Sequence, residues 1–220
     1  MNLYGFTFAS AALQAFGSGA LWWPEEKLLC VSDLHLGKSE RVARRTGQSL
    51  PPYETRDTLA RLAADLELSK ARTVVCLGDS FDDLQAAATL PEEERLWITQ
   101  LQAGRRWIWI EGNHDPGPIE FGGEHLRELA VGPLSFRHIA SDNPAGEVSG
   151  HYHPKAEIQT RRRRISRPAF LCDDQRLILP AYGTYTGGLR SDSDVLNQLM
   201  GPKALAILTG PMPTCVPMPR

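Results

Sequence analysis

The chain has 220 residues, of which 42% are hydrophobic and 23% charged, and its formal net charge is −2. These values are typical of a soluble globular protein that can bury a core, and they argue against a strongly basic protein that coats nucleic acid. Four scattered cysteines without a CxxC pair argue against a disulfide framework or zinc finger. With no signal peptide and no apolar run of membrane-spanning length, we expect a cytoplasmic protein.

Helices and strands alternate in the predicted first half of the chain. They are, in order, a strand at 3–8, a hairpin turning at 24–26, a basic helix at 38–46, an amphipathic helix at 55–68, a buried strand at 73–77, a helix from 91 and a strand at 106–110. Strands dominate the second half, at 133–138, 146–151, 155–161, 168–172 and 176–180, followed by a helix at 192–200 and a strand at 203–209. The segment 122–130 (GGEHLRELA) has a helical pattern. This order predicts a mixed α/β layered fold. Because no segment has the composition of a linker, we expect one domain over residues 1–220.

Four of the apolar runs end in clusters of polar side chains. The clusters are Asp33-x-His35, Gly78-Asp79, Gly112-Asn113-His114-Asp115 and Gly150-His151-x-His153. Because ligands bind outside the carboxyl ends of strands in open α/β sheets, we expect the clusters to converge. The first two patterns are common by chance, whereas GHxH is expected in roughly one or two chains per hundred and GNHD in fewer than about one per thousand. The occurrence of all four clusters in this order, each after an apolar run, is therefore a specific signal of a shared site.

The residue types in these clusters suit one chemistry. Carboxylate, imidazole and amide oxygen ligands favour divalent ions such as Mn, Fe or Zn. Residues two apart on a strand point to the same face, so Asp33 and His35 are expected to point into one site, and likewise His151 and His153. The two oxygens of Asp79 could bridge two ions.

These motifs resemble the calcineurin-like metallophosphoesterase superfamily over residues 33–153. The resemblance implies a β-sandwich of mixed sheets flanked by helices, with a dinuclear metal centre. The ligands it implies for one metal are Asp33, His35, Asp79 and His153, and for the other Asp79, Asn113, His151 and one further histidine. We expect His138 to be that histidine, with His125 as its competitor in the segment of helical pattern.

The same resemblance assigns catalytic roles and a reaction. His114 corresponds to the catalytic histidine of the superfamily and Asp115 to the carboxylate that orients it. The implied activity is phosphodiester hydrolysis by a metal-bridging hydroxide, with two divalent ions, of which Mn²⁺ is the first choice and Fe or Zn the alternatives. A phosphomonoesterase, a small nucleotide or pyrophosphate hydrolase, and a catalytically silent binding scaffold are the competing hypotheses.

A narrower resemblance rests on SDLHLGKSE (32–40) and PAYGTYTGGL (180–189). Both are similar to segments of the bacterial DNA-ligase-associated metallophosphoesterases, a family of DNA-damage-response endonucleases. The resemblance implies a nuclease or phosphodiesterase in DNA repair, with DNA as substrate and a DNA ligase or other repair proteins as partners. The sequence predicts no membrane contact and leaves the oligomeric state open.

Basic residues provide candidates for contact with substrate phosphate. Lys38, Arg41 and Arg45 share one side of the predicted helix that follows the first motif. In the arginine run 161–164, Arg161 and Arg163 alternate on one face and could meet a phosphate backbone, although such a run is more often a solvated strand end. Asp82 and Asp83 are interpreted either as groups that support the metal ligands or as a charge pair at a helix N-terminus.

Overall fold

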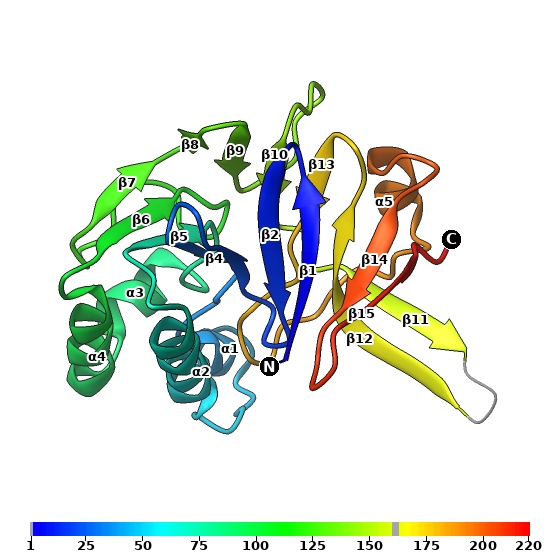
Figure 1. The fold of residues 1–220 in the computed structure, drawn as a ribbon. Coiled ribbons are helices and arrows are strands. Elements are labelled where there is room, and N and C mark those ends of the chain that lie inside the picture. The colour runs from blue at the N-terminus through cyan, green and yellow to red at the C-terminus, as the bar shows by residue number, and fades with distance from the viewer. Residues whose placement is uncertain (1, 160–162) are drawn as a thin grey trace.

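The computed structural model, which describes residues 2–159 and 163–220, contains two mixed β-sheets that pack face to face (Figure 1). The first sheet has seven strands, in sheet order β1 (Leu3–Phe8), β2 (Ala11–Phe16), β3 (Leu21–Trp23), β4 (Leu28–Val31), β5 (Thr73–Leu77), β6 (Arg106–Ile110) and β7 (Glu124–Leu126). Strands β1 to β4 pair antiparallel, and β4 to β7 pair parallel. The carboxyl ends of β4, β5 and β6 therefore meet at one edge of the sheet.

The second sheet runs in the order β15-β14-β12-β13-β10-β9-β8. Its strands are β8 (Glu128–Val131), β9 (Leu134–Arg137), β10 (Glu147–Ser149), β12 (Arg164–Cys172), β13 (Arg176–Ile178), β14 (Leu205–Leu208) and β15 (Thr214–Pro217). β11 (Lys155–Gln159) pairs with the first half of β12. These two strands form a hairpin that projects from the body of the protein (Figure 1). β11 follows the GHxH motif in the sequence and leads away from it.

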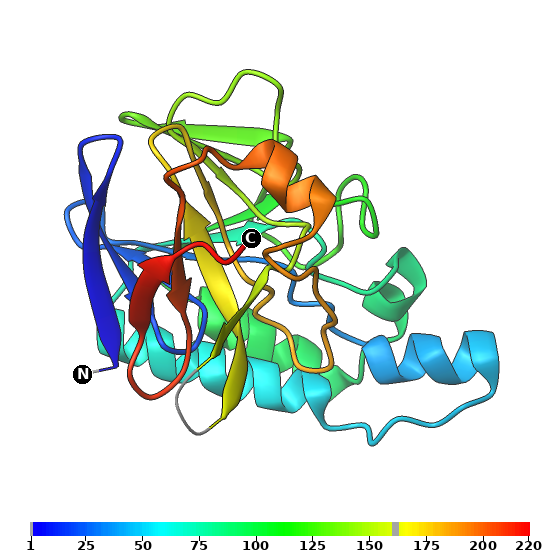
Figure 2. The same ribbon diagram turned by 90° about the vertical axis from the view of Figure 1, so that its right-hand side faces the viewer.

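Helices flank both sheets, and the first of them buries no residue (Figures 1 and 2). They are α1 (Lys38–Thr46), α2 (Glu54–Ser69), α3 (Leu84–Thr89), α4 (Glu92–Gln102) and α5 (Asp194–Leu199). The apolar face of α2, which includes Leu59, Leu62 and Leu66, packs against the first sheet, and Leu196 of α5 packs against the second. Among the described residues, no helix combines the length and apolar character that crossing a membrane requires.

Strand β5 shows how the sequence generates these layers. Val74 and Cys76 pack on the side of α2, whereas Val75 and Leu77 pack between the two sheets. This period of two is that of a strand buried on both faces, as the apolar run predicted. Each fully buried Val or Leu side chain contributes roughly 1.5–3 kcal/mol relative to an exposed one, so β5 is a firm support for the loop that follows it.

The predicted mixed α/β fold is confirmed, and one element was of the wrong type. Segment 122–130 contains strands β7 and β8, not a helix. β7 pairs with β6 and β8 with β9, and this tertiary pairing overrides the helical pattern. Two short strands, β2 and β15, were not predicted, and α3 was indicated only by the interpretation of Asp82 and Asp83 as a charge pair at a helix N-terminus.

Candidate metal centre and active site

The four polar clusters come together at the carboxyl ends of β4, β5, β6 and β10. The loops are joined by their own backbone: the amide of Asp33 donates to Gly78 O at 3.2 Å and that of His35 to Asp79 O at 2.9 Å. The amide of His151 donates to Oδ2 of Asp33 at 3.0 Å. Loops that are far apart in the sequence therefore fix one another, as the expected convergence required.

The clusters lie in loops beyond the strands, which corrects the expected strand alternation. β4 ends at Val31 and β10 at Ser149. Non-glycine residues rarely adopt positive φ, at a cost of about 1–3 kcal/mol each. Five candidate metal ligands do so, with φ between 46° and 68°: Asp33, His35, Asp79, His151 and His153. The side chains are aimed by this left-handed backbone and not by the pleat of a strand.

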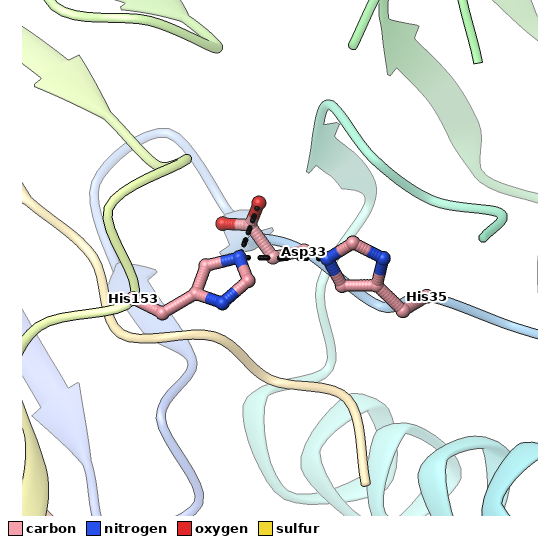
Figure 3. Close-up of side chains that lie close together, drawn as sticks. All are labelled: Asp33, His35 and His153. Carbon is pink, nitrogen blue, oxygen red and sulfur yellow. Dashed lines mark hydrogen bonds and ion pairs between the residues drawn. The ribbon is translucent and has the colours of Figure 1, made fainter. Parts of the chain in front are cut away.

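Asp33, His35 and His153 form the first donor group (Figure 3). The Nε2 atoms of the two histidines are 3.4 Å apart, and Nε2 of His153 lies 3.0 Å from Oδ1 of Asp33. Asp33 is fully buried, and its Oδ1 makes no hydrogen bond of normal geometry to the described residues. Two imidazole nitrogens and an unsatisfied buried carboxylate oxygen facing one another suit a cation between them.

Asp79, His138 and His151 form the second donor group, whose ligand atoms lie within 4.8 Å of one another. Nε2 of His138 is 3.4 Å from Oδ2 of Asp79 and 3.0 Å from Oδ1 of Asn113. His125 instead lies on β7, where it pairs with Trp109 of β6. Among the described residues, His125 is not a member of either donor group. The structure thus places His138, and not His125, beside the other candidate ligands.

The histidine tautomers fit metal binding. Nδ1 of His138 is 3.0 Å from the carbonyl oxygen of Leu77, and because a carbonyl only accepts, Nδ1 carries a proton. Nδ1 of His35 is 2.8 Å from a carboxylate oxygen of Asp82. In both rings this contact leaves Nε2, the nitrogen that faces the centre, as the atom that can bind a cation.

The carboxylates of the centre control the protonation of its histidines when it contains no cation. Burial opposes ionisation of Asp79, but the contact with His138 and the nearby His114 lower the pKa of Asp79 to about 2. Burial likewise lowers the pKa of His138, yet the contact with Asp79 and the charge of Asp33 raise it to about 9. The carboxylates thus hold a proton on a buried histidine, and a divalent cation would take the place of that charge.

Asp82 and Asp83 divide between the two interpretations offered by the sequence. Asp82 is fully buried; besides its contact with His35, it accepts a hydrogen bond from Arg41 at 2.8 Å and lies 3.5 Å from Nζ of Lys38. Burial opposes ionisation of Asp82, but the contacts with His35 and Arg41 and the charge of Lys38 hold its pKa far below its usual range. Asp83 is the N-cap of α3 and pairs with Arg44 at 2.8 Å. Asp82 therefore supports a candidate ligand, and Asp83 caps a helix.

His114 is oriented by a different group from the one expected. Its Nδ1 lies 2.8 Å from the backbone carbonyl oxygen of Asp82, and its amide donates to Oδ1 of Asp79 at 2.8 Å. The carboxylate of Asp115 instead accepts backbone hydrogen bonds from Gly112 at 3.2 Å, from Ser80 at 2.8 Å and from Phe81. Asp115 thus ties the GNHD loop to the loop after β5, and the role predicted for it is corrected.

Two glycines permit the close approach of these loops. Gly78 has φ of 76°, and a Cβ there would lie 2.3 Å from Nδ1 of His138. At Gly183 a Cβ would lie 2.0 Å from the carbonyl oxygen of Leu34, within the first motif. The PAYGTYTGGL segment therefore packs on the loop of the first motif.

Three of the basic candidates for substrate contact have carboxylate partners in the structure. Lys38 and Arg41 contact buried Asp82, and Arg45 lies 3.7 Å from Asp83. Arg161 lies outside the described residues, and Arg163 is an exposed residue just before β12. Contact of these residues with substrate stays a prediction.

Sequence reasoning missed a cavity of about 330 Å³ that adjoins the second donor group. Asn113 and His138 line one side of it, and Arg127, Arg137 and Ile139 contribute to the remainder. No motif marks the last three residues, which belong to the region where a helix was expected and to the following hairpin. Only the pairing of β8 with β9 places them together.

The fold and the donor groups are those of a known class of enzyme, the metallophosphoesterases. Residues 26–189 match the family model of calcineurin-like phosphoesterases, so the chain belongs to that family and is a metal-dependent hydrolase. Among solved structures, the chain is similar to the nuclease MPE of Pseudomonas putida, with a TM-score of 0.77 and 25% identity over 97% of this chain and 100% of that chain. No curated protein sequence matches the chain.

Proposed function

We propose that the protein is a dinuclear-metal-dependent phosphodiesterase that cuts nucleic acid in DNA repair. The observation that carries the proposal is the position of Asp79, whose Oδ2 lies 3.4 Å from Nε2 of His138 and 3.9 Å from Nε2 of His114. The carboxylate of Asp79 is thereby shared between the second donor group and the candidate catalytic histidine. Asp79 also forms a third donor group with His35 and His114, whose ligand atoms lie within 4.8 Å of one another.

The proposed ligands form two sets that share Asp79. The first set is Asp33, His35, Asp79 and His153, and the second is Asp79, Asn113, His138 and His151. Two divalent ions, for which we propose Mn²⁺ first, would supply Lewis-acid chemistry by lowering the pKa of water and neutralising charge on the phosphate oxygens. The remaining roles belong to the protein.

His114 is suited to exchange a proton with the leaving oxygen. Its side chain is 28% exposed, so substrate can reach it, whereas the nearby Asp79 is buried. Because the carbonyl of Asp82 accepts from Nδ1, the exchangeable proton is on Nε2, the atom nearer to Asp79. A protonated Nε2 can donate to the departing oxygen, and the neutral ring can then regain a proton from water.

The similarity to a nuclease structure supports a nucleic-acid substrate. The decisive experiment measures Mn²⁺-supplemented hydrolysis of an aryl phosphodiester, the matching monoester, and single- and double-stranded DNA, together with the metal content of the purified protein. We expect two ions per chain and diester hydrolysis well above monoester hydrolysis. Preference for the monoester would support a phosphomonoesterase, and no turnover with any of several metals would support a binding scaffold.

The repair role and partners need their own tests. Association with a DNA ligase rests on the sequence resemblance, and a pull-down with the tagged chain checks it. Sensitivity of a host strain without the gene to DNA-damaging agents checks the repair role. Wild-type survival after several kinds of damage would count against it.

A further inference from the structure

The cavity beside Asn113 and His138 has the features of a substrate subsite. Its volume, about 330 Å³, is that of a space for one small group, and it opens beside residues proposed to hold the second metal. Arg127 and Arg137 line it, along with one carboxylate, that of Glu111. A phosphate group beside the metal centre would therefore meet two guanidinium groups.

These guanidinium groups are available to a ligand in a way that the cations of α1 are not. The side chain of Arg127 is 90% exposed and lies 3.2 Å from Glu111, while Arg137 is 4.0 Å from the exposed Glu128. Ion pairs of this exposed kind contribute little to stability, so a phosphate can replace the carboxylate at small cost. Arg41, in contrast, is held by the fully buried Asp82.

The cavity also has an apolar wall. This wall is Ile139, which follows His138 directly and is 43% exposed. A free phosphate would gain nothing from such a wall, whereas the sugar or base of a nucleotide can pack on it. Cationic and apolar groups side by side thus favour a nucleotide over a simple anion.

We propose that this cavity binds the nucleotide next to the scissile phosphate, with Arg127 and Arg137 pairing with its flanking phosphate. The inference rests on the proposed function and extends it: the protein acts on substrates with more than one phosphodiester. A small aryl phosphodiester has a single phosphate, which the metal centre engages, so such a substrate does not use the two arginines.

The test compares two substrates in wild type, Arg127→Ala, Arg137→Ala and the double variant. In the double variant we expect kcat/KM for an oligonucleotide to fall at least about tenfold, with kcat/KM for bis-p-nitrophenyl phosphate within about twofold of wild type. The plot of log(kcat/KM) against log salt concentration should become shallower by about 0.7–0.9 for each phosphate contact removed. Arg72→Ala, which removes an exposed arginine at the amino end of β5, is the matched control and should change neither substrate.

The two substrates separate failure of the inference from failure of the proposed function. Equal losses on both substrates, or a loss in Arg72→Ala as large as in the double variant, would overturn the subsite. If the wild type hydrolyses neither substrate, the proposed function fails. Fluorescence anisotropy with a labelled oligonucleotide then still tests the subsite. Replacing Arg127 and Arg137 should weaken oligonucleotide binding, whereas replacing Arg72 should not.

Discussion

Replacing Asp82 by asparagine should weaken both the fold and metal binding. Asparagine keeps the shape of the side chain and one acceptor oxygen, but it removes the charge that faces His35 and Arg41 at 2.8 Å each. Hydrogen bonds to charged groups contribute about 1.5–3 kcal/mol and neutral ones about 0.5–1.5 kcal/mol. The loss of charge at two contacts therefore costs about 2–3 kcal/mol, or about 5–10 °C in Tm for a domain of this size.

The effect on metal binding follows from the ring of His35. Without the carboxylate at Nδ1, the ring loses the partner that fixes its tautomer and orientation. Replacing such a partner typically costs about 10- to 100-fold in metal affinity. Mn²⁺ titration followed by calorimetry measures this loss, and thermal unfolding in EDTA measures the stability of the metal-free protein separately.

Asp83→Asn is the matched control for this experiment. Asp83 carries the same charge one residue away, pairs with Arg44 near the surface and caps α3 by accepting from the amide of Ala86. Asparagine is as good an N-cap as aspartate, and an exposed ion pair contributes about 0–1 kcal/mol. We expect Tm and Mn²⁺ affinity near those of wild type. Equal losses in the two variants would refute the positioning role of Asp82.

Three other variants probe the site and its supports. His114→Ala should lower kcat about 10²- to 10⁴-fold while the metal content, measured by elemental analysis, stays unchanged; loss of metal would make His114 a ligand. Burial raises the pKa of Asp115 to about 7, above its unfolded value, so its protonated form stabilises the fold, and this stability is lost as pH rises from about 4 to 7. Urea unfolding in EDTA should show that decline, by up to about 4 kcal/mol, and Asp115→Asn should flatten it; an unchanged pH profile in the variant would contradict the reasoning. Tyr182→Phe removes the hydroxyl that donates to buried Asp65 at 2.8 Å and should cost about 1–3 kcal/mol of unfolding free energy, whereas a cost near zero would mean that water replaces it.

The sequence predicted the parts of this protein that depend on local pattern. Buried runs such as 73–77 and 106–110 give β5 and β6, and the amphipathic segment gives α2. The fold class followed from their order, and the candidate residues followed from motifs at strand ends. These features need only periodicity and residue type, which one chain carries within a few residues.

The features that were missed depend on contacts between distant segments. Segment 122–130 has a helical pattern, but pairing with β6 and β9 makes it two strands. The orienting partner of His114 is the backbone carbonyl of Asp82, and no residue type marks a carbonyl. Arg127 and Arg137 adjoin the centre only because β8 and β9 lie beside β10.

The left-handed backbone of the candidate ligands explains why their geometry cannot be read from strand alternation. Asp33 and His35 both adopt positive φ, so their side chains turn toward the centre after β4 has ended. Such conformations persist only where surrounding contacts fix them, and here the amides of both residues donate to the loop after β5. The strained backbone is therefore already present in the folded protein, and ligand binding does not have to induce it. It follows that the donor atoms are already in place when a cation arrives, and that loosening the loop after β5 would weaken binding without removing a single ligand.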